Sequence, residues 1–168
     1  MEARAEKSGD GYVLNGRKAV VIGGHCADVL VVSARTSGDS RVADGISLFL
    51  ISADAEGLDH RTYPTIDGSK GSDLFLNNVK LGPDALLGEE GKAAEVIEYQ
   101  AGRAISALCG EAVGAMEVAC DLTLEYLKQR KQFGVPIGKF QVLQHRMVDM
   151  MSELEQARSM AILAASVA

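Results

Sequence analysis

Cysteine is scarce in this sequence of 168 residues, which contains three cysteines. Cys26, Cys109 and Cys120 leave one thiol unpaired in any disulfide scheme, and neither they nor the three histidines show a metal-ligand spacing. The sequence therefore predicts reduced, buried thiols, which are typical of a reducing compartment. We expect a cytoplasmic protein without a metal site.

An excess of positive charge is also missing, because the formal net charge is -6. Binding to a nucleic acid backbone requires clustered Lys and Arg residues that release counterions, so we expect no nucleic acid partner. No apolar run is long enough to span a bilayer, and the opening stretch MEARAEKSGDGY has no apolar core of signal-peptide length. We expect neither export nor membrane insertion.

Short runs rich in β-branched and aromatic residues extend from Gly11 to about Gly88. They read YVL, KAVVIG, DVLVVSART, GISLFLISA and SDLFLNNVKL, while GSKGSD reads as a loop. The separators SGDG, LNG, TSGDSRVADG and NN supply the Gly and Asn residues that hairpin turns need at positive φ. This half of the sequence predicts an antiparallel barrel or sandwich.

Proline and turn clusters are absent from Lys92 to Arg130, which predicts one long helix. A seven-residue pattern of small and apolar residues predicts that one stripe of this helix is buried. The stripe comprises Ala94, Ala101, Leu108, Ala115 and Leu122, interleaved with Ile105, Ala112, Ala119 and Tyr126.

A second helix is predicted from about Lys139 to the end. Its apolar rows are Phe140, Met147, Leu154 and Ala161, and Leu143, Met150, Ala157 and Ala164. The chain ends in AASVA without a capping residue, so we expect the helix to continue in a longer protein. The predicted fold class is α+β, with a β domain over residues 1–88 and an antiparallel helical hairpin, half of a four-helix bundle, over residues 89–168. Such a hairpin would leave apolar surface exposed, so we expect self-association.

The turn between the helices, RKQFGVPIGKFQ, carries more chemistry than a helical hairpin needs. Arg130 can complement the negative end of the helix dipole, and Phe133 can simply pack. Arg130 and Gln141 can also be brought together as a bidentate phosphate donor beside an amide suited to a nucleotide. The residues alone leave both a structural turn and an anion site open.

The segment YLKQRKQFGVPIGKFQVLQHRMVDM resembles the helix-turn-helix signature of the acyl-CoA dehydrogenase family. GDGYVLNGRKAVVIGGHCADVLVVSAR, GISLFLISADAEGL and SDLFLNNVKLGPDALLGEEG resemble its middle β domain and the entry to its C-terminal helical domain. The resemblance implies that Arg130, Phe133 and Gln141 bind the diphosphate and adenosine part of a neighbouring subunit's FAD. It also implies that Arg103 lies near the thioester end of the substrate.

The family activity implied is the FAD-dependent α,β-dehydrogenation of an acyl-CoA thioester to a 2-enoyl-CoA, a reaction of fatty acid metabolism, with an electron-transferring flavoprotein as reoxidant. Val20 and Ile22 stand where many members carry a tryptophan and a threonine that contact the flavin. The helices that carry the family's catalytic glutamate have no counterpart, so we assign no catalytic residue and expect this segment alone to be inactive.

Two other interpretations remain open. The chain can be a non-catalytic, truncated partner subunit that acts as an oligomerisation module. Alternatively, the β half and the helices are unrelated domains, which proteolysis near Gly82 to Gly91 would separate.

Overall fold

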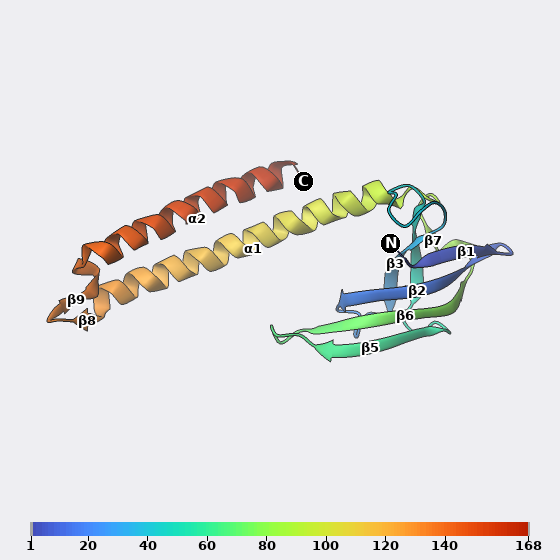
Figure 1. Cartoon of the computed structure of the whole chain (residues 1–168), viewed down its shortest axis with the longest axis horizontal. Helices are drawn as coiled ribbons and strands as arrows, with labels where there is room; N and C mark the ends of the chain where they lie inside the picture. The colour runs from blue at the N-terminus through green and yellow to red at the C-terminus, as the bar shows by residue number, and fades with distance from the viewer. Residues whose placement is uncertain (1, 168) are drawn as a thin grey trace. The chain divides into compact units, whose positions relative to one another are not determined.

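A computed structural model describes residues 2–167, which form two compact units (Figure 1). The first unit reaches to Ile97, and the second begins at Glu98. One long helix, α1, contributes residues to both units.

The first unit is a seven-stranded sheet with the strand order β5-β6-β2-β1-β3-β4-β7. Its strands are β1 (Arg4–Ser8), β2 (Gly11–Ile22), β3 (Val29–Arg35), β4 (Ile46–Ser52), β5 (Leu58–Pro64), β6 (Lys70–Leu81) and β7 (Leu86–Leu87), and a short 3-10 helix spans Pro83–Ala85. All strand pairs are antiparallel except β1 with β3. The expectation of a mainly antiparallel β unit is confirmed.

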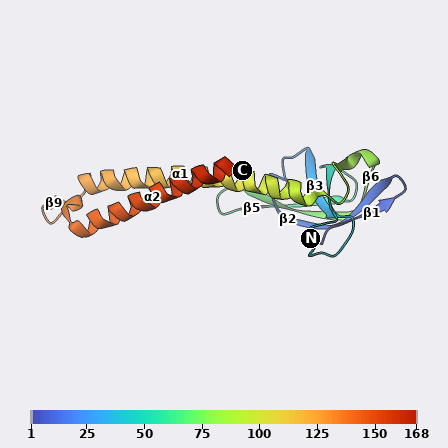
Figure 2. The same cartoon turned by 90° about the horizontal axis from the view of Figure 1, so that it is seen from above.

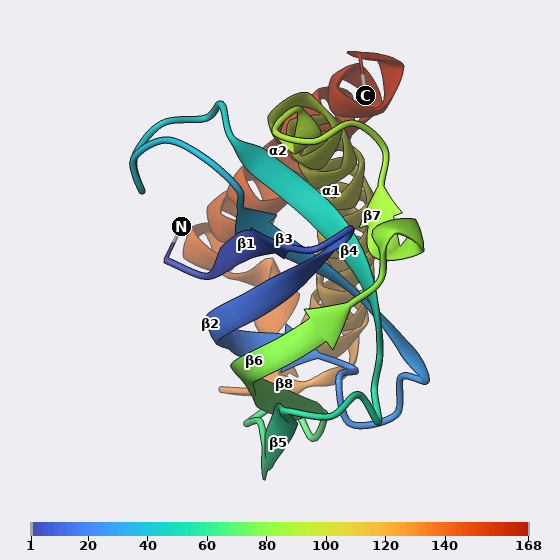
Figure 3. The same cartoon turned by 90° about the vertical axis from the view of Figure 1, so that its right-hand side faces the viewer.

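The sheet bends over its own apolar face. Tyr12 of β2 meets Phe49 of β4 edge to face, with 5.0 Å between the ring centroids, although these strands are not neighbours in the sheet. Figure 3 shows β4 crossing the direction of β2. The largest fully buried apolar side chains come from β2, β4 and β6 and are Leu14, Phe49, Ile51, Leu74, Leu76 and Val79. A single curved sheet thus encloses one core.

The sequence pattern missed β1, β5 and the two-residue strand β7, and the separators LNG and NN, predicted as turns, lie inside β2 and β6. β1 (RAEKS) and β5 (LDHRTYP) each bury one side chain, so neither shows the alternation that predicts a strand. Both are held by backbone pairing with a longer neighbour, β2 and β6 respectively. GSKGSD is not wholly a loop either, because β6 begins at Lys70.

The second unit is a helical hairpin, in which α1 (Ala93–Gln129) and α2 (Gln141–Val167) lie side by side and antiparallel (Figures 1 and 2). Both predicted helices are confirmed to within about two residues at the described ends. The connection contains two short strands, β8 (Lys131–Gln132) and β9 (Val135–Pro136), and a 3-10 helix, Ile137–Lys139. None of the described helices is long and apolar enough to cross a membrane.

The apolar rows predicted for α2 are correct, since Leu154 is buried and most other members are half-buried. The stripe predicted for α1 is wrong as the seam of this hairpin. Leu108 and Leu122 are 62% and 67% exposed. The least exposed row of α1 is instead Ser106, Cys109, Val113, Met116, Cys120, Thr123 and Leu127. Because α1 carries alanine and other apolar residues on several faces, periodicity alone does not show which row meets α2.

Candidate functional site at the tip of the helical hairpin

The tip of the hairpin is closed by backbone hydrogen bonds at the end of α1. The Arg130 amide donates to the Tyr126 carbonyl oxygen at 2.8 Å, and the Ile137 amide donates to the Arg130 carbonyl oxygen at 2.8 Å. Between these bonds, β8 and β9 pair through Gln132 and Val135. These hydrogen bonds fix the backbone of the connection, which makes a two-residue hairpin turn between α1 and α2.

The two central residues of this turn are Phe133 and Gly134, with φ of 54° and 79°. Turns with two positive φ values favour Asn-Gly, because a side chain such as that of phenylalanine is strained there by about 1–2 kcal/mol. The Phe133 side chain is also 89% exposed, and its ring meets that of Phe140 edge to face with 6.1 Å between the ring centroids. Phe133 is thus strained and exposed together, so folding of the turn does not explain its presence.

Arg130 and Gln141 flank this turn and are both exposed. In the described chain, no hydrogen bond or ion pair joins either side chain to another residue. Gln144 differs, because its Nε2 donates to the Gly138 carbonyl oxygen at 2.8 Å and so holds the 3-10 turn. The guanidinium of Arg130 and the amide of Gln141 therefore keep their hydrogen-bonding groups free for a ligand.

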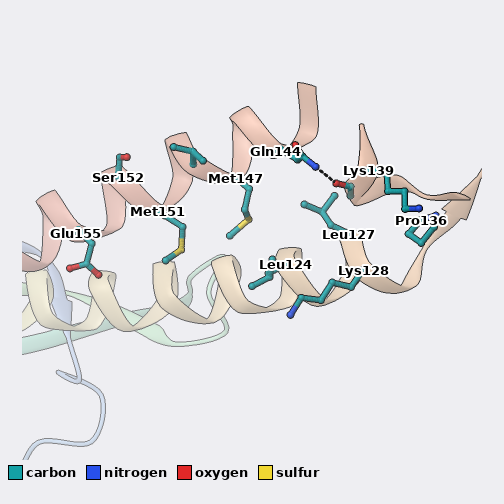
Figure 4. A pocket seen from close by; sticks show the side chains of 12 residues that line it. Leu124, Leu127, Lys128, Pro136, Lys139, Gln144, Met147, Met151, Ser152 and Glu155 are labelled. Carbon is teal, nitrogen blue, oxygen red and sulfur yellow. Dashed lines mark hydrogen bonds between the residues drawn. The ribbon is translucent and has the colours of Figure 1, made fainter. Parts of the chain in front are cut away.

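An apolar groove of about 780 Å³ adjoins the tip (Figure 4). Leu124 and Leu127 of α1 line it from one side, and Met147 and Met151 of α2 point toward them from the other. Unbranched methionine side chains adapt to the shape of whatever packs on them. The groove is open apolar surface directly beside the exposed polar tip.

Arg103 lies elsewhere in the second unit. It lies on α1, 27 positions before Arg130, which directly follows the last residue of that helix, so the separation is roughly 40 Å at the helical rise per residue. Its Nη1 donates to the Tyr99 hydroxyl at 3.0 Å, and its guanidinium lies 5.6 Å from the centre of that ring. A shallow cavity of about 250 Å³ is lined by Arg103, Ser106, Ala107 and Ala165. The three predicted cofactor residues therefore lie together at the tip of the hairpin, and Arg103 lies far from them along α1.

Val20 and Ile22 lie at the end of β2 in the first unit, with 60% and 66% of their surfaces exposed. Val20 has a positive φ of 55°. Sequence reasoning missed the residue that holds this conformation, Asp73 of β6, whose carboxylate accepts the Val20 amide. The signal was weak, because Asp73 follows a Gly- and Ser-rich stretch that reads as a loop. Across residues 2–167, no group of three or more His, Cys, Asp or Glu side chains could hold a metal ion.

Both halves of the chain match known proteins. Residues 1–79 match the family model of the acyl-CoA dehydrogenase middle domain, and residues 95–168 match that of the acyl-CoA dehydrogenase C-terminal domain. The mitochondrial 2-methylacyl-CoA dehydrogenase of Solanum tuberosum is 35% identical over 164 residues, which cover 95% of this chain and 39% of that protein.

Two solved structures extend the likeness to three dimensions. Butyryl-CoA dehydrogenase from Megasphaera elsdenii matches 98% of this chain and 44% of its own, with a TM-score of 0.89 and 31% identity. A structure described as the electron transferring flavoprotein of Acidaminococcus fermentans matches 99% of this chain and 44% of its own, with a TM-score of 0.88 and 30% identity.

The mainly antiparallel, curved sheet and the helical hairpin that follows it make this an α+β protein. The chain belongs to the acyl-CoA dehydrogenase family and resembles both its middle domain and its C-terminal domain. It spans about two fifths of the length of the curated relatives it matches.

Proposed function

We propose that this chain forms part of a FAD-dependent acyl-CoA dehydrogenase and that its hairpin tip binds the diphosphate and adenosine part of an FAD held by an adjoining protomer. Phe133 carries the proposal, because it is strained and 89% exposed between two unpartnered polar side chains. Non-glycine residues in strained conformations concentrate at binding sites, where they present a side chain to a ligand.

The residues of the tip fit this group chemically. The Arg130 guanidinium can donate two parallel hydrogen bonds to diphosphate oxygens. The Gln141 amide can both donate to and accept from a ribose or a base edge. The exposed Phe133 ring can cover an apolar face of the same ligand.

In the complete enzyme, bound FAD supplies the acceptor for the hydride from the acyl β-carbon. The residues of this chain would bind and orient the cofactor at the tip, and Arg103 would contact the acyl-CoA near its thioester. We assign no catalytic base to this chain, so removal of the α-proton requires a carboxylate from elsewhere. An electron-transferring flavoprotein is the proposed reoxidant, in keeping with the structural match to the Acidaminococcus fermentans protein.

Flavin retention tests the proposal on the chain as it exists. The purified protein is dialysed against FAD, its visible spectrum is recorded, and dye reduction is assayed with a panel of acyl-CoA thioesters. Arg130→Met removes the diphosphate donors, and Lys131→Met is the matched control because it removes the next charge along the exposed tip.

Loss of a charge-assisted contact predicts weaker FAD binding in R130M by roughly tenfold to a hundredfold, with K131M unchanged. A wild-type protein that retains FAD regardless of Arg130 would contradict the assignment of the tip. A colourless, inactive but oligomeric wild type would favour the second candidate below.

The second candidate is a non-catalytic partner subunit that acts as an oligomerisation module through the helical hairpin. The observation in its favour is the exposed apolar row of α1 together with the groove beside the tip. Self-association through the hairpin is part of both candidates, whereas FAD binding at Arg130 belongs to the first.

A further inference from the structure

Lys18 of β2 extends its amine toward β3. Its Nζ donates to Ser33 Oγ at 3.0 Å, and the residue is half-buried. Strand β1 lies between β2 and β3 in the sheet, but its pairing with β2 ends at Asn15. The Lys18 side chain therefore spans the gap between β2 and β3 beyond the end of β1.

A cavity of about 170 Å³ adjoins this side chain. Besides Lys18, it is lined by Ala19, Val21, Leu30, Val31, Val32, Ser33 and Leu74. Ala19 and Val31 are exposed, whereas Leu30 and Leu74 belong to the core, so the cavity extends from the surface toward the core. An apolar cavity of roughly 150 Å³ is large enough to hold benzene, so this one has room for a short acyl chain.

No carboxylate neutralises the Lys18 ammonium in the described part of the chain. Within residues 2–167, none lies at ion-pair distance from its Nζ. The adjacent Arg17 pairs with Asp73 and points to the opposite face, because successive side chains of a strand alternate. The other residues that line the cavity are all uncharged. Lys18 is thus a half-buried amine in neutral surroundings.

These surroundings favour the neutral form of the amine. Desolvation by burial lowers the pKa of Lys18 from its ordinary value of 10.5. Lys7 shows the opposite case, because its hydrogen bond to Glu90 raises its pKa. The neutral amine is the nucleophilic form of lysine, and it attacks electrophilic carbonyl carbons.

We propose that Lys18 is an acylation site, at which the amine takes a short, uncharged acyl group from an acyl-CoA thioester and holds it in the adjoining cavity. The choice of acyl-CoA as donor rests on the proposed function, whereas the reactivity of the amine does not.

The reaction needs no further reactant. The Nζ lone pair attacks the thioester carbonyl carbon, and the carbon–sulfur bond breaks with its electron pair passing to sulfur. The nitrogen then loses a proton to the thiolate, so the products are an amide and a free thiol. The amide keeps one N–H for Ser33 Oγ, and the positive charge is lost.

The lining of the cavity selects the acyl group. Once Lys18 is acylated, no cation remains among the residues that line the cavity. A carboxylate at the far end of the acyl chain would be desolvated there without a partner. Acetyl and other short apolar acyl groups are therefore accepted, and dicarboxylic acyl groups are disfavoured.

Mass spectrometry of each lysine peptide after incubation of the purified chain with acetyl-CoA tests the proposal. Lys80 of β6 is the matched comparison, because it is an exposed lysine of the same sheet. Near neutral pH, Lys18 should be acetylated faster than Lys80 by roughly threefold or more, since a larger fraction of its amine is neutral. Equal or slower labelling of Lys18 would overturn the proposal.

Two further donors separate the parts of the proposal. With succinyl-CoA, the ratio of Lys18 to Lys80 labelling should fall below that with acetyl-CoA, and an unchanged ratio would overturn the role of the cavity. S-acetyl-N-acetylcysteamine carries the same thioester without the nucleotide. Preferential labelling of Lys18 by this donor but not by acetyl-CoA would overturn the choice of acyl-CoA, whatever the outcome of FAD binding.

Ser33→Asp tests the cause of the reactivity, because it places a carboxylate beside the Lys18 amine. It should slow the acetylation of Lys18 by roughly tenfold, since an opposite charge stabilises the ammonium form. Ser33→Asn is the matched control for size, and circular dichroism verifies that both variants fold. Equal labelling in S33D and S33N would overturn the proposal.

The pH profile of the wild type decides the question if S33D does not fold. Acetylation of Lys18 should level off at a lower pH than that of a lysine in a short peptide, because burial lowers its pKa from 10.5. No other charged or titratable residue lines the cavity to produce such a profile. A profile that levels off at the same pH as the peptide, or higher, would overturn the proposal.

Discussion

The Tyr12 hydroxyl donates a hydrogen bond to Oε2 of Glu90 at 2.9 Å, although 78 positions of sequence separate them. The same carboxylate oxygen accepts Lys7 Nζ at 2.8 Å. Glu90, which precedes α1, is thus bound to Lys7 of β1 and Tyr12 of β2. The Gly91 amide adds a bond to Ser47 Oγ at 2.8 Å. The start of α1 is therefore anchored to the first unit by side chains.

Tyr12→Phe should reduce the free energy of unfolding by about 1 kcal/mol, because it removes one hydrogen bond and keeps the buried ring against Phe49. Urea unfolding followed by circular dichroism measures the change. The matched control is Tyr126→Phe, since Tyr126 is 59% exposed and should change stability little. Equal losses in Y12F and Y126F would show that the Glu90 contact contributes nothing.

The same contacts predict a dependence of stability on pH. The Lys7 and Tyr12 hydrogen bonds lower the pKa of Glu90 from its ordinary 4.5, so this contribution is present above pH 4.5 and lost as pH falls through the lowered value. The hydrogen bond to Glu90 raises the pKa of Lys7 from 10.5, so that contribution is present below pH 10.5 and lost as pH rises through the raised value.

Glu90→Gln should therefore reduce stability between about pH 5 and pH 10 and make it less dependent on pH below 4.5. Thermal unfolding from pH 3 to 8 measures both effects. The matched control is Glu89→Gln, the exposed preceding residue. A pH profile of E90Q parallel to that of the wild type would contradict the assignment.

Arg35 is the most completely buried cation of the first unit, at 2% exposure. Its guanidinium donates to carbonyl oxygens of the loop before β4, namely those of Ser37 (3.2 Å), Ser40 (3.5 Å), Val42 (2.6 Å) and Asp44 (2.9 Å). Lysine cannot reproduce this planar set of donors. Arg35→Lys should therefore reduce the free energy of unfolding by about 3 kcal/mol.

Hydrogen exchange should localise that loss to the loop over residues 36–45. Arg41→Lys changes an exposed arginine of the same loop and serves as the control. If amide protection in the loop were equal in R35K and R41K, the carbonyl contacts of Arg35 would not be what orders it.

A substitution at the turn residue Phe133 distinguishes a role in stability from a role in ligand binding. Phe133→Asn should keep or raise the stability of the chain, because relief of about 1 kcal/mol of backbone strain offsets the lost edge contact with Phe140. Gly134→Ala should lower stability, since φ is 79° at that position. Thermal unfolding measures both variants, and FAD titration of F133N measures the proposed contact. A marked loss of stability in F133N would show that the ring serves the fold.

Parts of the fold followed from the sequence because local patterns were strong. The helix bounds were predictable from the absence of proline, and the α2 rows that bury Leu154 were predictable from their regular spacing. The polar strand β1 was not predictable, because it exists through pairing with β2 rather than through its own side chains. The exposure of Leu108 was not predictable either, since it depends on which face of α1 meets α2.

The candidate site shows the same division. Arg130, Phe133 and Gln141 could be predicted as cofactor-binding residues because they lie in one short segment that matches a family signature. The strain at Phe133 and the role of Gln144 required backbone angles and a hydrogen bond. Asp73 was missed because its partners, Arg17 and Tyr63, are far from it in sequence and are brought together by the strand register.

The exposed row of α1 predicts an interface. Leu108 and Leu122 are separated by two heptads, so they lie on one face of α1, and they are 62% and 67% exposed. Leu108→Lys combined with Leu122→Lys should leave the thermal unfolding of the hairpin nearly unchanged, as expected for surface positions, while it weakens self-association. Leu154→Ala should do the reverse, because it removes a buried side chain from the hairpin seam and reduces stability by about 2–5 kcal/mol.

Analytical ultracentrifugation over a range of protein concentrations measures the self-association, and circular dichroism measures the stability of each variant. The row acts as an interface between copies if the wild type associates and the double lysine variant sediments as a monomer with its helices intact. A wild type that stays monomeric at high concentration would contradict self-association through this row. Self-association through this row would also be contradicted if the double variant associates as strongly as the wild type, because two lysine charges in a dry helical interface would prevent close packing.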